Sequence, residues 1–289
     1  GGRATRPAAS TDRLPERVTH RAGLTYRCHP QPPRDEVYRG QQLGDVTTPP
    51  YDLAEGTVRL AELPLLFDPG TRWNYSMSTD VCGRLIEVIS GQPLDEYLQE
   101  RVLGPLGMVD TAFHAPESEL GRCSTLYGRG ADGRVHRVAG PRRMIEPPTF
   151  LSGGGGLVGT GRDYLRFCHL LLNGGELDGV RLLGPRTVDY MARNHLPDGK
   201  LLNQMGQSTF AESAMEGTGF GLGFGIVEDA AALQNLATEG ELSWGGAAST
   251  AFWVDPPADI CVVFMTPLPP SRPYPIPPPP RTPRPPAAP

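Results

Sequence analysis

Apolar residues recur at helical spacing in several stretches of the chain. Between positions 81 and 89 they stand three and four residues apart, at Val81, Leu85, Val88 and Ile89. This spacing predicts a helix that Thr79 caps and Gly91 ends. Similar patterns predict further helices near residues 51–62, 93–102, 160–171 and 185–191. The helix near 160 opens with Thr160 and Asp163, a pair that resembles a capping box.

Apolar runs in the last third of the chain predict strands instead of helices. These strands are expected at 219–227, 241–244, 249–254 and 259–266. The last two are separated by Asp-Pro-Pro-Ala at 255–258, so we expect them to pair as an antiparallel hairpin. A second hairpin is expected around Asp132-Gly133, within the irregular, arginine-rich region 114–149.

The composition changes towards both ends of the chain. Residues 1–17 are rich in Gly, Arg, Ala and Pro without periodicity, and we expect them to be disordered. Residues 27–50 are polar and proline-rich, which indicates a surface loop. Beyond Thr266 prolines dominate, and such a segment forms neither a helix nor a central strand. The sequence therefore predicts one domain at 18–266, followed by a disordered proline-rich tail at 267–289.

Composition and charge exclude several classes of function. The chain has 289 residues, a formal net charge of −5 and a pI near 5.7. No basic patch is interleaved with aromatic residues, so nucleic acid is not an expected partner. No apolar run approaches the roughly 20 residues of a membrane helix, so no membrane association is expected.

Cysteine and histidine usage points away from metals. The five cysteines and six histidines show no metal-ligand spacing, so no metal or other cofactor is expected. The plain interpretation is a cytoplasmic protein with reduced thiols. The absence of an initiator Met leaves a removed leader open, and the sequence does not indicate the oligomeric state.

A tyrosine and a serine stand on a short loop at 73–77, which reads Trp-Asn-Tyr-Ser-Met. An Asp-Pro-Gly turn at 68–70 precedes it and the first predicted helix follows, so Tyr75 and Ser76 stand where a rigid scaffold presents chemistry. Taken alone, such a pair is more often packing and turn structure. Four consecutive glycines at 153–156 allow left-handed backbone angles or a close approach of the backbone to another group. No Gly-Lys-Ser/Thr follows them, which excludes a phosphate-binding loop.

Four features, in their order along the chain, resemble the serine β-lactamase and penicillin-binding-protein superfamily. They are Tyr75-Ser76, the Leu-Gly-Met turn at 106–108, the glycine run before a Thr-x-x-Asp-Tyr helix start, and Trp-Gly-Gly at 244–246 before a final hairpin. The chain is most similar to the class C-like esterase branch, the family VIII carboxylesterases. The resemblance implies an α+β fold, in which a helical region lies beside an antiparallel sheet flanked by helices and the active site lies between them.

The resemblance also implies roles for individual residues. Tyr75 matches the tyrosine that relays a proton between nucleophile and leaving group, and the amide of Ala247 would be an oxyanion-hole donor. The remaining expected substrate contacts are Ser76, Met77, Trp244, Gly245 and Gly246. Met77 stands where specialised β-lactamases have an asparagine that holds the lactam side chain. This departure argues against a specialised β-lactamase and is compatible with an esterase, so the expected partner is a small-molecule ester or lactam.

The nucleophile motif of that family, Ser-x-x-Lys, does not occur in these 289 residues. Lys200 is the only lysine, and Pro197 stands three positions before it. Arginine does not replace lysine as a base because it keeps its proton, and no Gly-x-Ser-x-Gly elbow is present. In the family the Ser-x-x-Lys helix precedes the segment matched by 19–24, and a helix follows the last strand. We therefore expect a fold incomplete at both ends and a chain that is inactive alone.

Three functions follow from these patterns. The first is a serine hydrolase, a carboxylesterase that acts on small acyl esters through an acyl-enzyme and whose nucleophile lies outside this sequence. The second is a non-catalytic protein that binds a ligand in the same cleft. The third is a proline-rich peptide for an SH3-type groove. The esterase hypothesis is preferred, and it requires Tyr75 to face residues 244–247 although they are far apart in sequence.

Overall fold

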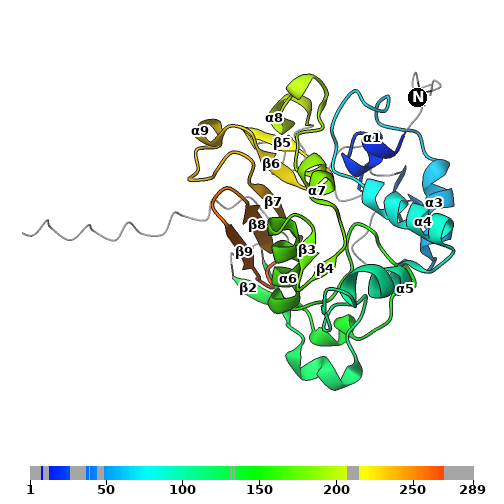
Figure 1. Ribbon diagram of the computed structural model, residues 1–289. Coiled ribbons are helices and arrows are strands. Elements are labelled where there is room, and N and C mark those ends of the chain that lie inside the picture. Colours follow the sequence, from blue (N-terminus) through cyan, green and yellow to red (C-terminus); the bar gives the residue numbers. More distant parts are fainter. Residues whose placement is uncertain are drawn as a thin grey trace, which may run out of the picture.

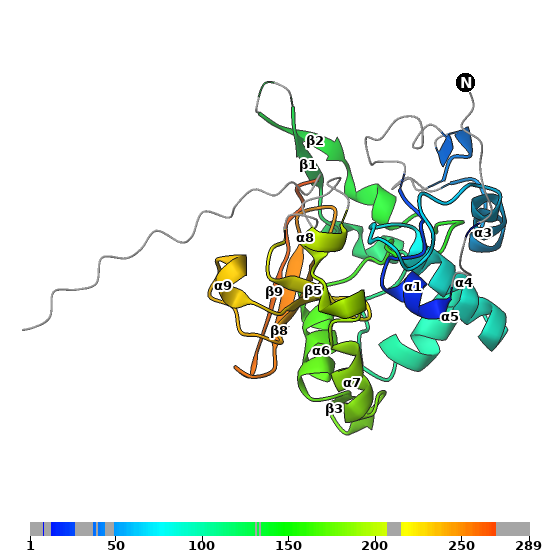
Figure 2. The same cartoon turned by 90° about the horizontal axis from the view of Figure 1, so that it is seen from above.

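The computed structural model describes residues 8, 13–26, 37–38, 40–43, 49–130, 132, 134–206 and 215–269. Figures 1 and 2 both show a helical region on one side of the molecule and a sheet with flanking helices on the other. This arrangement confirms the predicted α+β, β-lactamase-like fold. Much of the predicted loop at 27–50, and the tail from residue 270 onwards, lie outside the described residues.

The helical region is built around one central helix. Its elements are α1 (Leu14–Val18), α3 (Leu53–Ala61), α4 (Ser78–Ser90) and α5 (Leu94–Leu98), which a π-helical turn continues over Gln99–Leu103. Helices α1, α3 and α5 each pack against α4. Helix α1 begins inside the stretch predicted to be disordered, so that prediction is wrong for residues 14–17. Pro15 stands in its first turn, where the fixed backbone angle of proline suits a helix start.

Helix α4 confirms the helix predicted at 81–89 but not its cap. It begins at Ser78, so Thr79 lies inside the first turn and does not cap it. Gly91 ends the helix as predicted, in the left-handed conformation with φ 72°. Val88 and Ile89 are 62% and 83% exposed. The apolar spacing therefore identifies the helix but not which of its side chains are buried.

The largest sheet of the described residues has five strands. In spatial order they are β5 (Thr218–Phe220), β6 (Gly225–Val227), β7 (Leu242–Gly245), β8 (Ala251–Asp255) and β9 (Ile260–Phe264), each antiparallel to the next. The β8–β9 pair confirms the predicted final hairpin. The single strand predicted at 219–227 is wrong, because the chain reverses within it. The Gly221 amide donates to Phe224 O (2.8 Å), and Gly223 takes φ 100°, which only glycine adopts without strain.

The main core lies between this sheet and α6 (Gly161–Leu172), which packs on β8 and β9 (Figure 1). Its buried members are Cys168, Leu171, Phe224, Ile226, Leu242, Phe252 and Val254. The Thr160 hydroxyl accepts the Asp163 amide hydrogen (3.2 Å), which confirms the predicted N-cap. The Asp163 carboxylate accepts instead from the Asp110 amide (2.8 Å) and the Thr111 hydroxyl (2.9 Å), so the capping box is not reciprocal.

Smaller elements complete the described chain. They are the hairpins β1 (Leu126–Arg129) with β2 (Val135–Ala139) and β3 (Glu176–Leu177) with β4 (Val180–Arg181), the helices α7 (Pro185–Met191), α8 (Leu202–Met205) and α9 (Ala230–Leu233), and 3-10 turns at Glu117–Arg122, Pro141–Met144 and Pro197–Gly199. The β1–β2 pair confirms the hairpin predicted around residue 132. Among the described helices, none combines the length and the apolar character needed to cross a bilayer.

Candidate active site

The loop that carries Tyr75 is tied to the segment that follows α1. The Asn74 amide donates to His20 O (2.9 Å), and Asn74 Nδ2 donates to Leu24 O (2.8 Å). Asn74 is buried, and buried polar groups need such partners because no water can replace them. These bonds therefore fix the backbone of the loop immediately before Tyr75.

Tyr75 is half-buried in a cluster of aromatic rings. Its ring centroid lies 5.6 Å from that of Trp244, 5.4 Å from that of Tyr26, 4.7 Å from that of His20 and 6.5 Å from that of Trp73. Tilted ring pairs at these separations are attractive beyond the apolar area that they bury. Trp244 belongs to β7, so the ring contact brings together two of the predicted site residues, one from the loop before α4 and one from the sheet.

His20 supports the tyrosine loop as a neutral hydrogen-bond acceptor. Its side chain is 3% exposed, and the Ser76 amide donates to its Nδ1 (3.3 Å). A backbone N–H can only donate, so Nδ1 carries no proton. Burial lowers the pKa of His20 from 6.5 to about 3, because the imidazolium would lose its hydration. The ring is therefore uncharged at neutral pH.

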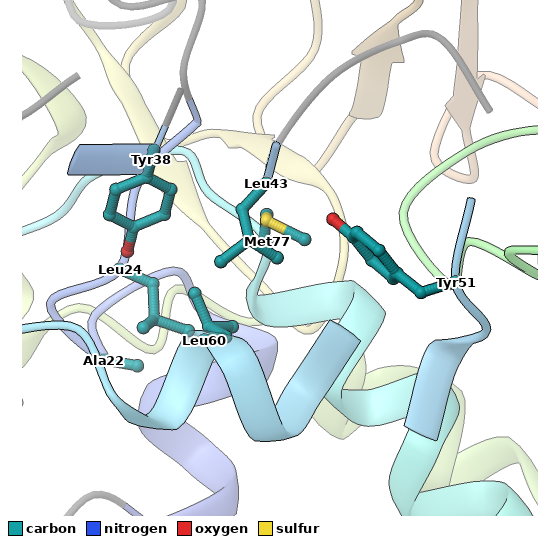
Figure 3. Packing of buried hydrophobic residues seen from close by; sticks show 7 residues of the cluster. All are labelled: Ala22, Leu24, Tyr38, Leu43, Tyr51, Leu60 and Met77. Atoms are coloured by element: carbon teal, nitrogen blue, oxygen red, sulfur yellow. The ribbon is translucent and has the colours of Figure 1, made fainter. Parts of the chain in front are cut away.

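Ser76 and Met77 do not lie open to a ligand. Ser76 is 0% exposed, and its hydroxyl is 2.9 Å from that of Ser78. Met77 is 4% exposed and belongs to a cluster shown in Figure 3, with Ala22, Leu24, Tyr38, Leu43, Tyr51 and Leu60. Both environments favour a structural role, so the structure does not support the prediction that these two residues contact substrate.

The Trp-Gly-Gly motif spans the end of β7 and a tight loop. Gly245 still pairs with Ala251 of β8, and the Gly246 amide donates to Thr250 O (2.8 Å). Gly246 is half-buried, whereas Gly245 and Ala247 are exposed. Within the described part of the chain, the Ala247 amide donates to no protein acceptor. This N–H is therefore available to a ligand at the end of β7.

A buried carboxylate lies beside the aromatic cluster, and no local sequence pattern marks it. Asp80 is 2% exposed and accepts hydrogen bonds from the Ser152 hydroxyl, the Gly154 amide (3.3 Å) and the Tyr26 hydroxyl. Burial raises the pKa of Asp80, and these donors oppose that rise. Since Tyr26 also contacts the ring of Tyr75, the cluster connects α4, the glycine run and the tyrosine loop.

The glycine run crosses helix α4 at very short range. A Cβ on Gly153 would lie 2.3 Å from Thr79 O and 3.1 Å from Gly83 Cα. A side chain at position 153 would therefore force the two segments apart. The close backbone approach expected from the four glycines is confirmed, and the segment approached is α4.

These parts define a class of protein. A tyrosine loop contacts the third strand of a five-stranded antiparallel sheet, a free amide follows that strand, and no group of His, Cys, Asp and Glu among the described residues is placed to hold a metal. This is the layout of the serine β-lactamase and penicillin-binding-protein fold. The β-lactamase family model matches residues 18–278, and the chain belongs to this family.

Known proteins similar to the chain include esterases. It is 37% identical over 265 residues to protein Rv1367c of Mycobacterium tuberculosis strain ATCC 25618 / H37Rv, over 90% of this chain and 63% of that protein. It is 31% identical over 267 residues to esterase EstB of Burkholderia gladioli, over 86% of this chain and 63% of EstB. The solved structure of EstCE1, "a hydrolase with promiscuous acyltransferase activity", matches with a TM-score of 0.74 and 26% identity, over 89% of this chain and 67% of that one.

The chain thus spans 63% of the length of the first curated relatives that it matches. The family comprises serine hydrolases and acyltransferases of the β-lactamase-like fold. We therefore treat as proposals the activity of the whole protein, its substrate and its nucleophile.

Proposed function

We propose that this chain carries the tyrosine and oxyanion side of a serine carboxylesterase that acts on small acyl esters. The observation that carries the proposal is the contact of Tyr75 with Trp244, whose ring centroids are 5.6 Å apart. Through this contact the tyrosine loop lies beside the loop that holds the free Ala247 amide. The names of EstB, an esterase, and EstCE1, a hydrolase, support the reaction class.

In the proposed reaction, a serine oxygen attacks the carbonyl carbon of the ester while its hydroxyl proton passes to the lysine amine of the Ser-x-x-Lys motif and on to Tyr75. The carbonyl oxygen becomes an oxyanion and accepts a hydrogen bond from the Ala247 amide, a type of contact that contributes about 10² to 10³ in rate. The carbon–oxygen bond to the alcohol then breaks, and Tyr75 passes a proton to the leaving alkoxide. Water attacks the resulting acyl-serine, its proton passes through Tyr75 to the serine oxygen as the acyl–serine bond breaks, and the carboxylic acid is released.

The nucleophile of this reaction is assigned to a Ser-x-x-Lys helix outside the 289 residues, because none occurs within them. Ser76 is buried against Ser78, and the Ser152 hydroxyl donates to Asp80. Neither serine has a lysine beside it, and a serine hydroxyl is a weak nucleophile until a positioned base takes its proton. The Ser76 hydroxyl lies 3.4 Å from His20 Nδ1, but Ser76 is 0% exposed and does not reach a substrate. The 289-residue chain alone is therefore expected to be inactive.

A fluorophosphonate probe tests the proposal, since it labels only activated serines. We expect stoichiometric labelling and hydrolysis of p-nitrophenyl butyrate by the full-length gene product, and no labelling of the 289-residue chain. Tyr75→Phe should lower kcat of the full-length protein by about 10² to 10⁴. Tyr190→Phe, which removes the hydroxyl of a tyrosine 59% exposed on α7, is the matched control and should leave kcat unchanged.

Two results would contradict the proposal. Labelling of the 289-residue chain would show that a serine within it is the nucleophile. A full-length protein that folds but neither reacts with the probe nor hydrolyses the ester would favour the alternative, a non-catalytic protein that binds a ligand in the same cleft.

Acyl transfer to an alcohol is a second candidate, favoured by the rings around Tyr75. Trp73, Tyr26 and Trp244 surround the tyrosine with apolar surface, which suits an apolar alcohol better than water as the acceptor of the acyl group. EstCE1 is described as a hydrolase with promiscuous acyltransferase activity. Adding an alcohol to the esterase assay distinguishes the two functions: a transferase forms the new ester faster than the free acid.

A further inference from the structure

The loop after Trp-Gly-Gly is held by the segment that follows β9. The Thr266 hydroxyl donates to Ala248 O (2.6 Å) and lies 3.2 Å from Ser249 O. The Leu268 amide donates to the same Ala248 oxygen (3.1 Å), and the Ser249 hydroxyl donates back to Leu268 O (2.8 Å). Residues 266–268, which we call the clamp segment, therefore contact the loop through two donors and one acceptor.

The clamp segment is itself fixed on its other side. The Tyr127 amide of β1 donates to Pro267 O (2.8 Å), so the segment runs between the β1–β2 hairpin and the loop. Pro267 lacks an N–H but its carbonyl can still accept. Pro267 and Leu268, which lie beyond the domain end expected at residue 266, thus both form hydrogen bonds with the preceding part of the chain.

The loop needs such support. Ser249 has φ 62°, a left-handed conformation that costs a non-glycine residue roughly 1 kcal/mol or more. On one side of Ala247, the Gly246 amide is held by Thr250 O (2.8 Å). On its other side, the Ala248 carbonyl accepts from the Thr266 hydroxyl and the Leu268 amide. The carbonyl of the peptide unit that carries the Ala247 amide, Gly246 O, also accepts from the Ser249 amide (3.0 Å). With these groups fixed, the Ala247 amide keeps one direction even though it makes no hydrogen bond of its own to the described chain.

We propose that Thr266 is a positioning residue, which orients the Ala247 amide towards the oxyanion through the Ala248 carbonyl. The proposal rests on the function proposed above for Ala247. Donors that are oriented before the reaction stabilise the transition state without reorganising during it. Losing the Thr266 hydroxyl should thus weaken transition-state binding more than substrate binding.

The test compares two variants of the full-length protein. Thr266→Val keeps the shape of the side chain and removes its donor, and Thr266→Ser restores the donor. We expect Thr266→Val to lower kcat about tenfold, less than the 10² to 10³ that follows from losing an oxyanion donor itself, with KM changed less than twofold. Affinity for an alkylboronic acid, which mimics the tetrahedral intermediate, should fall by the same factor, and Thr266→Ser should recover both.

Thr57→Val is the matched control, because the Thr57 hydroxyl donates to a backbone carbonyl in α3 (2.8 Å) and plays no part in the loop. It should leave kcat and boronic acid affinity unchanged. If Thr266→Val does not fold, Ser249→Ala removes the other side-chain bond to the clamp segment and should lower kcat in the same selective way.

The outcomes separate this inference from the proposed function. An inactive, unlabelled wild-type protein overturns the esterase proposal and this inference with it. An active wild type whose Thr266→Val variant keeps kcat and boronic acid affinity within twofold overturns the inference alone. The inference would also be overturned if Thr266→Val lowered kcat/KM only by raising KM, with kcat unchanged. That pattern indicates general damage to substrate binding.

Discussion

The buried His20 makes the stability of this protein depend on pH in a defined direction. In the folded chain Nδ1 accepts the Ser76 amide hydrogen, and burial lowers the pKa to about 3. In the unfolded chain the same ring titrates near 6.5. Between these values the unfolded state binds one more proton than the folded state, so the free energy of unfolding falls as the pH falls.

The magnitude follows from the two pKa values. The contribution is fully present above pH 6.5 and is lost as the pH falls towards about 3. At 1.36 kcal/mol per pH unit, lowering the pH from 7 to 5 should cost about 2 kcal/mol. Asp80 acts in the opposite sense, because its pKa is raised and its neutral form is favoured by folding. The contribution of His20 to the pH dependence of stability is therefore measured as the difference between the wild type and a variant without the histidine.

The variant is His20→Asn, whose side-chain oxygen can still accept from the Ser76 amide but does not titrate. It should be less stable at every pH because it loses ring contacts with Trp73, Tyr75 and Phe220. The loss of stability between pH 7 and pH 5 should, however, be smaller than in the wild type by about 2 kcal/mol. Urea unfolding of the full-length protein at pH 5, 6 and 7 measures this difference.

His114→Asn, the same replacement at an exposed histidine, is the matched control. The reasoning fails if His20→Asn and the wild type lose the same stability between pH 7 and pH 5. It also fails if the wild type gains stability relative to the variant on acidification, because that sign would require a charged imidazolium in the folded state.

Two further predictions concern segments that frame the site. Gly153→Ala should destabilise the protein by about 1 to 3 kcal/mol, because its Cβ would lie 2.3 Å from Thr79 O. Gly155→Ala, whose Cβ would have nothing within 4 Å, should change stability by less than about 0.5 kcal/mol in thermal unfolding. Equal effects of the two changes would contradict the close approach of the glycine run to α4. Thr160→Ala should cost about 1 kcal/mol by removing the N-cap of α6 and Thr160→Ser much less, and an unchanged midpoint in urea for Thr160→Ala would show that the cap does not contribute.

Local sequence patterns predicted the elements that depend on neighbours in the chain. The helix at 81–89, the cap at Thr160 and the final hairpin follow from spacing, capping chemistry and turn residues, and each is present in the structure. The strand at 219–227 failed because alternating glycine and apolar residues suit a strand and a tight reversal equally. Only the pairing of β5 with β6 distinguishes a continuous strand from a reversal, and this pairing depends on the tertiary fold.

The same limit applies to the candidate site. The sequence identifies the Tyr75 loop and the Trp-Gly-Gly motif, but it does not predict the burial and the contacts of the residues in them. Met77 is expected at the substrate but lies in a core cluster. The sequence alone does not show whether an apolar residue next to a motif points to the site or to the core. Asp80 and Ser152 were missed as a pair because 72 positions separate them, and no spacing rule reaches that far.

The two loops that approach each other at the site are both held by residues outside any motif. His20 and Leu24 fix the tyrosine loop, and Thr266 with Leu268 fixes the loop of Ala247. A loop has one conformation only when its backbone groups have partners, and a site keeps its geometry only when the surrounding residues keep those partners in place. The motifs therefore locate the chemistry in this family, whereas the rigidity of the site comes from segments that a motif search passes over.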